Sequence, residues 1–291
     1  MNLFFLSITI TVSGGVFALL LCRQFTAMKI LAVLGIVAGC CLGALDALSK
    51  LTYDGTVQAS FVYLTTLSLD FKIDGLAAFF LLAIFAVSLL AAVYSFHYMN
   101  DTQKPLRTAA NYFFFSLLVA SMALVVAAAN MLTFLLAWEI MSLSSFFLVI
   151  HDHQTPENRK AGYLYFVFSH VGAMFILAAF GIIYSQTGSF DFGAVGLSAS
   201  LKLLAFTFAF IGFGSKAGVF PFHVWLPHAH PAAPSHISAV MSGVMIKTGI
   251  YGILRMYSIL DLHTPAVGTM ITSILSTSFF RSKLDVNIGL L

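Results

Sequence analysis

The chain has 291 residues, of which 60% are hydrophobic and only 9% are charged, and its formal net charge is +3. A soluble core of this size needs more polar surface than these residues provide, so a soluble globular protein is excluded. The few cationic residues are scattered rather than gathered into a stripe, which excludes nucleic acid as a partner. The composition indicates an integral membrane protein.

Eight apolar runs are long enough to cross about 30 Å of hydrocarbon as helices that rise about 1.5 Å per residue. Unpaired backbone amides are costly in lipid, and an open chain avoids them by forming helices. The sequence therefore predicts an all-α integral membrane protein, a polytopic bundle with spans at about 3–21, 28–48, 76–98, 109–129, 131–150, 161–184, 201–224 and 235–260.

Between the second and third runs, residues 56–74 mix β-branched and aromatic residues in rough alternation. This pattern is typical of a short β-hairpin, which we expect to lie at the membrane surface with a structural role. Basic residues at alternate ends of the runs place the N-terminus outside by the positive-inside rule, with Arg255 as an exception. The two sets are Arg23, Lys29, Lys104, Arg107, Arg159 and Lys160 on one side, and Lys50, Lys72 and Lys202 on the other.

Ionisable side chains inside the spans suggest function, because each costs about 2.5 to 3.5 kcal/mol at a helix centre on insertion scales. Glu139 lies near the middle of the fifth span, in LLAWEIMSLSSFFLV. Lys216 lies in the seventh span, in IGFGSKAGVFPF, beside Gly214, Gly218 and Pro221. Glycine and proline weaken a helix and free backbone groups, which a membrane tolerates where protein or water satisfies them. We therefore predict a broken seventh helix beside an aqueous cavity.

Lys247 lies twelve residues beyond Ser235, the residue that follows Pro234. About 18 Å of helix then places this lysine deep in the bilayer. One interpretation is that Glu139 and one lysine form a buried ion pair that fixes helix register. Two lysines and one glutamate leave one cation unpaired unless it loses its proton, so we also predict a switchable proton carrier.

Histidines could extend a proton path or bind a metal. His170, in the sixth span, is interpreted either as a hydrogen-bonded core histidine or as a proton relay. The spacing of the histidines in FHVWLPHAHPAAPSH matches no familiar zinc pattern, so we expect no metal site there. No nucleotide loop, nucleophile elbow or redox ligand set occurs, and we expect neither a cofactor nor a catalytic centre in the chain. The four clustered residues are His223, His228, His230 and His236.

Three stretches resemble a known family. They are FKIDGLAAFF, WEIMSLSSFFLV and KAGVFPFHVWLPHAHPAAPSHISAVMSGVMIKTGIYGILR, within about residues 67–260. They are similar to the antiporter-like, proton-translocating membrane subunits of respiratory complex I and membrane-bound nickel–iron hydrogenases, most closely the hydrogenase-4 and formate hydrogenlyase type. His228 stands where many relatives have aspartate.

The resemblance implies roles for the charged residues. Glu139 would pair with Lys216, Lys247 would pass protons toward the membrane midplane, and His170 would join this relay. It also implies partner membrane subunits in a redox-driven complex of the bacterial inner (cytoplasmic) membrane.

The family contains two inverted repeats of helices, and the resemblance implies that only the first is present here. The chain then divides into N-terminal helices with the hairpin at 1–108, a five-helix antiporter-like repeat at 109–260 and a divergent tail at 261–291. We expect a truncated product that holds the half-channel through which protons enter and that does not pump protons alone.

The function that follows is proton translocation within a hydrogenase-4, formate hydrogenlyase or NADH:quinone oxidoreductase type of complex. One alternative is a subunit of a multi-subunit cation/proton antiporter, which works without redox partners. The other is a non-transporting structural membrane subunit whose charges only fix the packing. Substitution of Lys247 distinguishes the structural alternative from the two transport functions.

Overall fold

The computed structural model describes residues 1–53, 56–64, 67–193, 196–262 and 269. Eight helical spans within these residues are long and apolar enough to cross a membrane, which confirms the predicted multi-pass helical bundle. The tail at 261–291 lies outside the described residues except at 261, 262 and 269. The first six spans are α1 (Asn2–Leu20), α2 (Phe25–Thr52), α3 (Gly75–Tyr98), α4 (Pro105–Ala127), α5 (Met131–Val149) and α6 (Pro156–Thr187).

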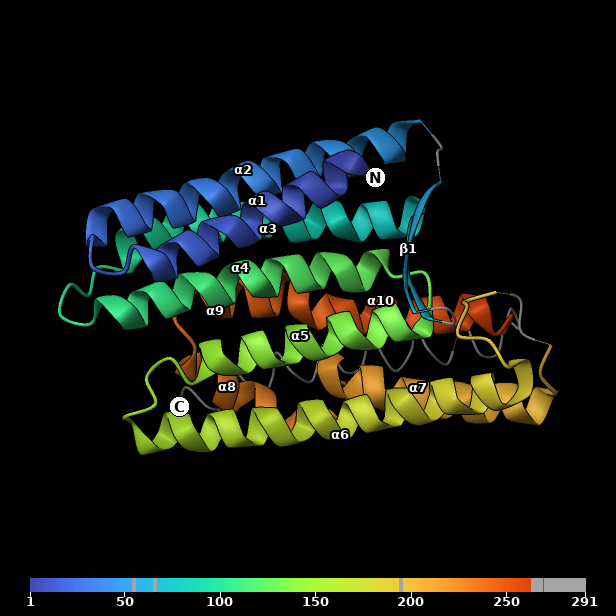
Figure 1. Cartoon of the computed structure of the whole chain (residues 1–291). Helices are drawn as coiled ribbons and strands as arrows, with labels where there is room; N and C mark the ends of the chain where they lie inside the picture. The colour runs from blue at the N-terminus through green and yellow to red at the C-terminus, as the bar shows by residue number, and fades with distance from the viewer. Residues whose placement is uncertain (54–55, 65–66, 194–195, 263–268, 270–291) are drawn as a thin grey trace.

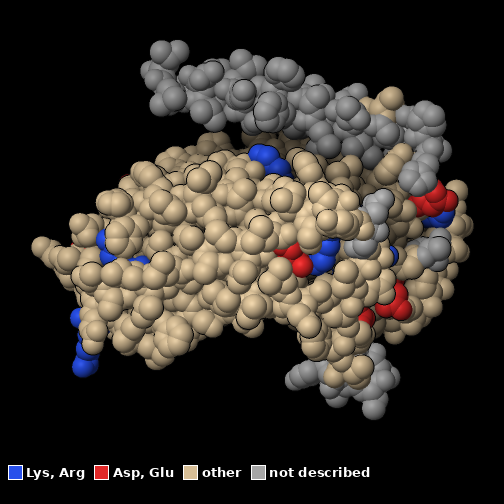
Figure 2. Space-filling model, turned by 90° about the horizontal axis from the view of Figure 1, so that it is seen from above, with Lys and Arg blue, Asp and Glu red and all other residues tan. Residues whose placement is uncertain are grey.

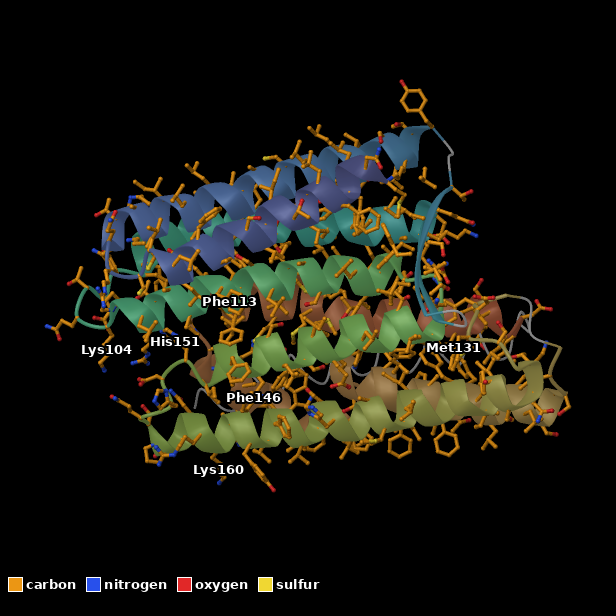
Figure 3. All side chains as sticks on the ribbon, viewed as in Figure 1. Lys104, Phe113, Met131, Phe146, His151 and Lys160 are labelled. Atoms are coloured by element: carbon orange, nitrogen blue, oxygen red, sulfur yellow. The ribbon has the colours of Figure 1, made fainter. Side chains whose placement is uncertain are left out.

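The spans run side by side, so their connections gather at two ends of the bundle (Figure 1). The basic end holds the turns that join α1 to α2, α3 to α4 and α5 to α6, and it includes Lys104, His151 and Lys160 (Figure 3). The opposite, hairpin end holds the two strands and Met131. Figure 2 shows that charged residues occupy only a few places on the face between these ends. A mostly uncharged middle between polar ends suits a bilayer.

The predicted hairpin is present at the hairpin end. Its strands β1 (Val57–Leu64) and β2 (Leu67–Ile73) pair antiparallel. Phe5 of α1 packs edge-on against one phenylalanine of each strand, with ring centroids 5.2 and 5.3 Å apart. The Asp70 carbonyl accepts a hydrogen bond of 2.8 Å from the Ala129 amide, between α4 and α5. The hairpin thus joins the N-terminal helices to the α4–α5 turn.

The seventh span is broken, as the sequence predicts. The first part, α7 (Ala199–Ala217), ends at Gly218, which has a φ of +70°. Residues with a side chain rarely adopt this left-handed backbone, so glycine permits the helix to stop there. Pro221 then precedes the 3-10 turn η1 (Phe222–Trp225), and α8 (Leu226–Ala232) follows. The break lies within the long candidate span of residues 199–232.

The eighth span contains an irregularity that the sequence analysis did not predict. After Pro234, whose carbonyl accepts two amide hydrogen bonds of the first turn, α9 (Ser235–Val240) begins. It continues through the π-helical segment η2 (Met241–Met245) into α10 (Ile246–Ile259). A π turn contains one more residue than an α turn and shifts the side chains that follow it. Lys247 is the second residue after this segment.

Candidate functional site

Lys216 lies in the last turn of α7, with only 3% of the residue exposed. Its ammonium donates hydrogen bonds to Tyr165 Oη at 2.6 Å and to Ser142 Oγ at 3.2 Å. Beyond the lysine, the Val219 amide donates to the Gly214 carbonyl at 2.9 Å and closes the helix. A buried cation with hydroxyl partners is therefore located at the break of the seventh span.

Tyr165 of α6 is the centre of these contacts, and it is fully buried. Its Oη shares a 2.5 Å hydrogen bond with Ser145 Oγ and lies 3.8 Å from Met245 Sδ of η2. The Lys216 ammonium also lies 4.8 Å from the centre of its ring, within the range of a cation–π contact. One hydroxyl therefore connects four parts of the bundle: α5, α6, α7 and η2.

Tyr165, Ser142 and Ser145 were not predicted from the sequence as site residues. A signal existed for the serines, because they are three residues apart in the fifth span and so share a helix face. The only signal for Tyr165 was a hydroxyl group within an apolar run. Such a hydroxyl is common at ordinary helix contacts, so it did not indicate a partner for a particular lysine.

Glu139 lies near the middle of α5, and its partner is His170 of α6. Glu139 Oε2 is 3.5 Å from His170 Nε2, and the side chains are 38% and 29% exposed, respectively. His170 Nδ1 is 2.9 Å from the Phe166 carbonyl, which can only accept a hydrogen bond, so Nδ1 carries the ring proton. Nε2 is then the ring nitrogen that faces the Glu139 carboxylate.

The structure does not bring all predicted relay residues together. Among the described residues, no ion pair joins Glu139 to Lys216 or to Lys247. Glu139 contacts His170, while Lys216 contacts two hydroxyl groups. The Glu139–Lys216 pair that the family resemblance implies is therefore not formed in this arrangement. The relay roles of these residues stay predictions.

Lys247 is half-buried, and its ammonium donates a 2.6 Å hydrogen bond to the Ser242 carbonyl in η2. The Ser242 hydroxyl in turn donates to the Ser238 carbonyl at 2.9 Å. Ser238 Oγ lies 3.1 Å from His230 Nδ1 of α8. The second lysine thus lies on a line of polar groups that follows the eighth span back toward α8.

The histidines grouped in the sequence have different neighbours. The His223 ring lies 5.6 Å from the Phe220 ring, and His228 Nδ1 is 3.0 Å from the Val224 carbonyl. His236 is 1% exposed, and its Nε2 lies 3.0 Å from Asn111 Oδ1 of α4. Within the described part of the chain, no group of three or more metal-ligating side chains is arranged to hold an ion.

Arg255, the exception to the charge rule in the sequence, is paired at the hairpin end. Its guanidinium bonds both oxygens of Asp74, at 2.5 and 3.0 Å, and donates to Tyr251 Oη at 2.6 and 3.0 Å. Burial acts to raise the pKa of Asp74, but the hydrogen bonds from Arg255 and from the Ala77 amide outweigh it, so the pKa lies below its ordinary value. The negative partner reduces the charge that Arg255 presents at this end.

Lys50, another cation toward the hairpin end, is paired in the same way. It forms an ion pair with Asp46, one turn earlier in α2. Both residues are buried: Lys50 is 9% exposed and Asp46 is 7% exposed. Asp46 was not among the residues singled out from the sequence, although it is an ionisable residue within a predicted span.

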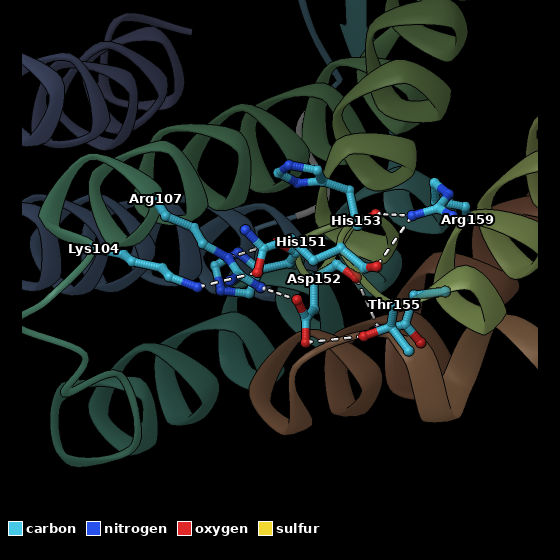
Figure 4. Close-up of polar contacts among 9 residues, drawn as sticks. Lys104, Arg107, His151, Asp152, His153, Thr155 and Arg159 are labelled. Atoms are coloured by element: carbon cyan, nitrogen blue, oxygen red, sulfur yellow. Dashed lines mark hydrogen bonds and ion pairs between the residues drawn. The ribbon is translucent and has the colours of Figure 1, made fainter.

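The loop between α5 and α6 is held to α4 at the basic end (Figure 4). Arg107 Nε donates to the His151 carbonyl at 2.7 Å, and its Nη2 lies 2.9 Å from Asp152 Oδ1. Burial, together with the nearby Arg107 guanidinium, lowers the pKa of the His151 side chain to about 4. His151 is therefore neutral near pH 7.

The low pKa of His151 predicts how the thermal stability of the chain depends on pH. An unfolded histidine has a pKa of about 6.5, so between about pH 6.5 and 4 the unfolded chain binds a proton that folded His151 does not bind. We expect the melting temperature to fall as the pH is lowered through this window, and to fall less in His151→Gln. The Gln variant keeps the backbone carbonyl that Arg107 contacts. Exposed His153 is the control, and a His153→Gln variant that flattens the profile equally would contradict the assignment.

The sequence matches two family descriptions. Residues 128–284, more than half of the chain, match the family described as NADH:quinone oxidoreductase/Mrp antiporter, TM. Residues 62–107 match the one described as NADH-Ubiquinone oxidoreductase (complex I), chain 5 N-terminus. The first match includes Glu139, Lys216 and Lys247.

Among curated proteins, hydrogenase-4 component B of Escherichia coli (strain K12) is 44% identical over 190 residues, which are 64% of this chain and 28% of that protein. The chain thus spans less than a third of that relative's length. A chain in the structure of the archaeal membrane-bound sulfane sulfur reductase has a TM-score of 0.75, with 20% identity over 89% of this chain and 54% of that chain. A chain in the structure of the Mrp complex from Dietzia sp. DQ12-45-1b also has a TM-score of 0.75. It is 21% identical, and the match covers 89% of this chain and 28% of that chain. At such low identity these two likenesses show the fold alone.

Proposed function

The chain belongs to the NADH:quinone oxidoreductase/Mrp antiporter family of membrane proteins, and we propose that it carries protons within a redox-driven complex of the hydrogenase-4 or NADH:quinone oxidoreductase type. The family resemblance found in the sequence is confirmed by this membership. The observation that supports proton transport most is the hydrogen bonding of buried Lys216 to hydroxyl groups.

Hydroxyl partners suit a lysine that changes its protonation state. A charged ammonium donates hydrogen bonds, whereas a neutral amine also needs to accept one. Tyr165 and Ser142 can do both, because a hydroxyl is a donor and an acceptor. Lys216 can therefore lose a proton without leaving its partners unsatisfied, which an exclusive carboxylate partner would not permit.

A path between the two lysines is proposed through η2. Tyr165 contacts Met245 at one end of η2, and Lys247 contacts the Ser242 carbonyl within it. A shift of this π segment would change both contacts at once. We propose Lys216 and Lys247 as proton carriers, with the Glu139–His170 pair as a further proton-binding position on the outer side of α5 and α6.

Coupling to redox chemistry would act through the electric field at these charges. Partner subunits that undergo the redox reaction would bring Glu139 toward or away from Lys216 and so change the proton affinity of Lys247. Moving one charge across 100 mV requires about 2.3 kcal/mol, and one pKa unit corresponds to about 1.4 kcal/mol. A pKa change of about two units is therefore sufficient.

The same proposal implies partner subunits and an orientation of the chain in the membrane. Other membrane subunits of the complex would cover part of the bundle, and the basic end would face the cytoplasm across a bacterial inner membrane. The chain would hold the half-channel through which protons enter. Protons would move without a cofactor bound to this subunit.

The cation/proton antiporter alternative is favoured by the Mrp likeness of the fold. The two functions differ in their driving force. An antiporter moves protons when a sodium gradient is imposed without any redox substrate, whereas the proposed subunit moves them only during redox turnover. Proton uptake into vesicles under each condition distinguishes them.

The proposal is tested with Lys247→Met in the assembled complex, reconstituted into vesicles that contain a pH-sensitive dye. We expect proton uptake per redox turnover to fall about ten-fold or more, because a methionine cannot hold the proton that Lys247 passes on. Lys160→Met, at an exposed position on α6, is the matched control and should transport normally. Unchanged transport in Lys247→Met would instead support the purely structural function.

A further inference from the structure

A pocket of about 590 Å³ lies at the basic end, outside the proposed proton path. It is formed between the first turns of α4 and the end of α5 with the loop that follows. None of the predicted relay residues, Glu139, His170, Lys216 or Lys247, lines it. The pocket therefore needs a separate explanation.

One face of α4 gives this pocket a graded polarity. Lys104, Arg107, Asn111 and Phe114 line it, and their spacings of three, four and three residues place them on one stripe at the start of the helix. Over about 15 Å of helix the lining changes from charged groups to an amide and then to an aromatic ring. This order matches the headgroup, ester and acyl regions of a phospholipid that stands at a membrane surface.

The inner part of the pocket is apolar and open to the side. The Phe114 ring of α4 stacks on the Phe147 ring of α5, with centroids 4.5 Å apart and planes 17° apart. Phe147 is 42% exposed, and Leu106 at the rim is 63% exposed. An acyl chain packed along these side chains would remove their surface from any remaining contact with water at the interface.

The outer part of the pocket is cationic. Two basic residues line it, Lys104 and Arg107, and no Asp or Glu is among the lining residues. The Lys104 ammonium donates to Gln154 Oε1 at 3.3 Å, a neutral partner. Arg107 uses two of its five N–H groups on the His151 carbonyl and on Asp152, which lies outside the lining (Figure 4). Both cations therefore retain donors for an anion.

A buried donor lies deeper in the pocket. Asn111 is 2% exposed, and its Oδ1 lies 3.0 Å from His236 Nε2. Its Nδ2 has no hydrogen-bond partner among the described residues. A buried amide donor without a partner is costly, and this amide continues the polar face of the pocket that begins at Lys104 and Arg107.

We propose that this pocket binds one anionic phospholipid, with its phosphate at Lys104 and Arg107 and an acyl chain against Phe114 and Phe147. Basic pockets between membrane helices on the cytoplasmic side bind such headgroups. A zwitterionic lipid fits less well, because no carboxylate in the lining faces its ammonium group. The apolar part favours a lipid over free phosphate. The proposal does not depend on proton transport.

The test measures lipids that remain bound to the full chain after purification in detergent. The chain is equilibrated with phosphatidylglycerol or with phosphatidylcholine of the same acyl chains, and retained lipid is counted by native mass spectrometry. We expect preferential retention of phosphatidylglycerol and a loss of roughly five-fold in its affinity in Lys104→Gln, since one basic residue near a membrane surface contributes about that factor. Lys160→Gln, at the same end but outside the pocket, should retain the lipid as the unaltered chain does.

A second variant tests the acyl contact. Phe114→Ala should weaken retention of both lipids, but this variant should still retain more phosphatidylglycerol than phosphatidylcholine. Equal retention of the two lipids by the unaltered chain, or equal losses in Lys104→Gln and Lys160→Gln, would overturn the proposal. Displacement of the bound lipid by millimolar inorganic phosphate would also overturn it, because the site would then recognise phosphate without the lipid.

Discussion

Lys216→Met is expected to reduce redox-driven proton uptake by the assembled complex at least about ten-fold while leaving the chain as stable as before or slightly more stable. Lys216 is 3% exposed, so its charge is desolvated, and its described contacts are with hydroxyl groups rather than a carboxylate. Replacing an unpaired buried charge by an apolar side chain of similar length removes the desolvation cost. Dye-monitored uptake in vesicles and a melting curve of the same preparation measure the two effects.

Two further variants make this prediction specific. Lys202→Met lies at the opposite end of α7 and should leave proton uptake unchanged. Tyr165→Phe keeps the ring but removes the hydroxyl that Lys216 contacts, and we expect uptake to fall by roughly ten-fold, the effect of losing a hydrogen bond to a charged group. Loss of stability in Lys216→Met without loss of uptake would show that the lysine has a structural role instead.

Gly249→Ala is expected to destabilise the chain by about 1 to 3 kcal/mol, the usual cost of overpacking a core. Gly249 of α10 faces α7 directly, and a Cβ atom there would lie 2.6 Å from the Phe213 carbonyl oxygen and 2.9 Å from the Ala217 amide nitrogen. Both atoms belong to the backbone, so the helices must separate. The residue beside Ala217 is Lys216, and we expect proton uptake to fall with stability. Thermal unfolding in detergent measures the change.

The matched control is Gly181→Ala in α6, where a Cβ atom would meet nothing within 4 Å. Alanine is better than glycine in a helix interior by about 0.5 to 1 kcal/mol, so this variant should be slightly more stable. The same substitution thus has opposite effects at the two positions. If Gly249→Ala raised the melting temperature, as we expect for Gly181→Ala, α7 and α10 would not pack as closely as described.

Much of the fold was predictable because its signals are local. A membrane span requires about twenty consecutive apolar residues whatever its neighbours are, and the eight predicted runs correspond to the eight observed spans. The break at Gly218 and the hairpin before α3 were also visible, since glycine, proline and strand alternation act over a few residues. The π segment η2 was not visible, because its residues resemble those of an ordinary apolar helix.

The partners of the charges were harder to predict. Opposite charge suggested that Glu139 pairs with one of the two lysines, and the family resemblance implied that this lysine is Lys216. The fold instead brings Tyr165 and Ser142 to Lys216 from 51 and 74 residues away. Arg255 was counted as an exception to the positive-inside rule, yet Asp74, 181 residues earlier in the chain, pairs with it. The predicted site residues were found by their cost in the membrane, but that cost does not identify what satisfies them.

The sequence by itself therefore determined that the chain crosses a membrane, where its spans lie, where one of them breaks, and that Glu139, Lys216 and Lys247 lie within them. These properties depend on the free energy of transferring each segment into lipid and on local backbone preferences. Only the tertiary structure decided which hydroxyl groups contact Lys216, which acids pair with Lys50 and Arg255, and that a graded pocket forms beside α4. These depend on how helices rotate and approach one another, and several different packings satisfy the same hydrophobic pattern.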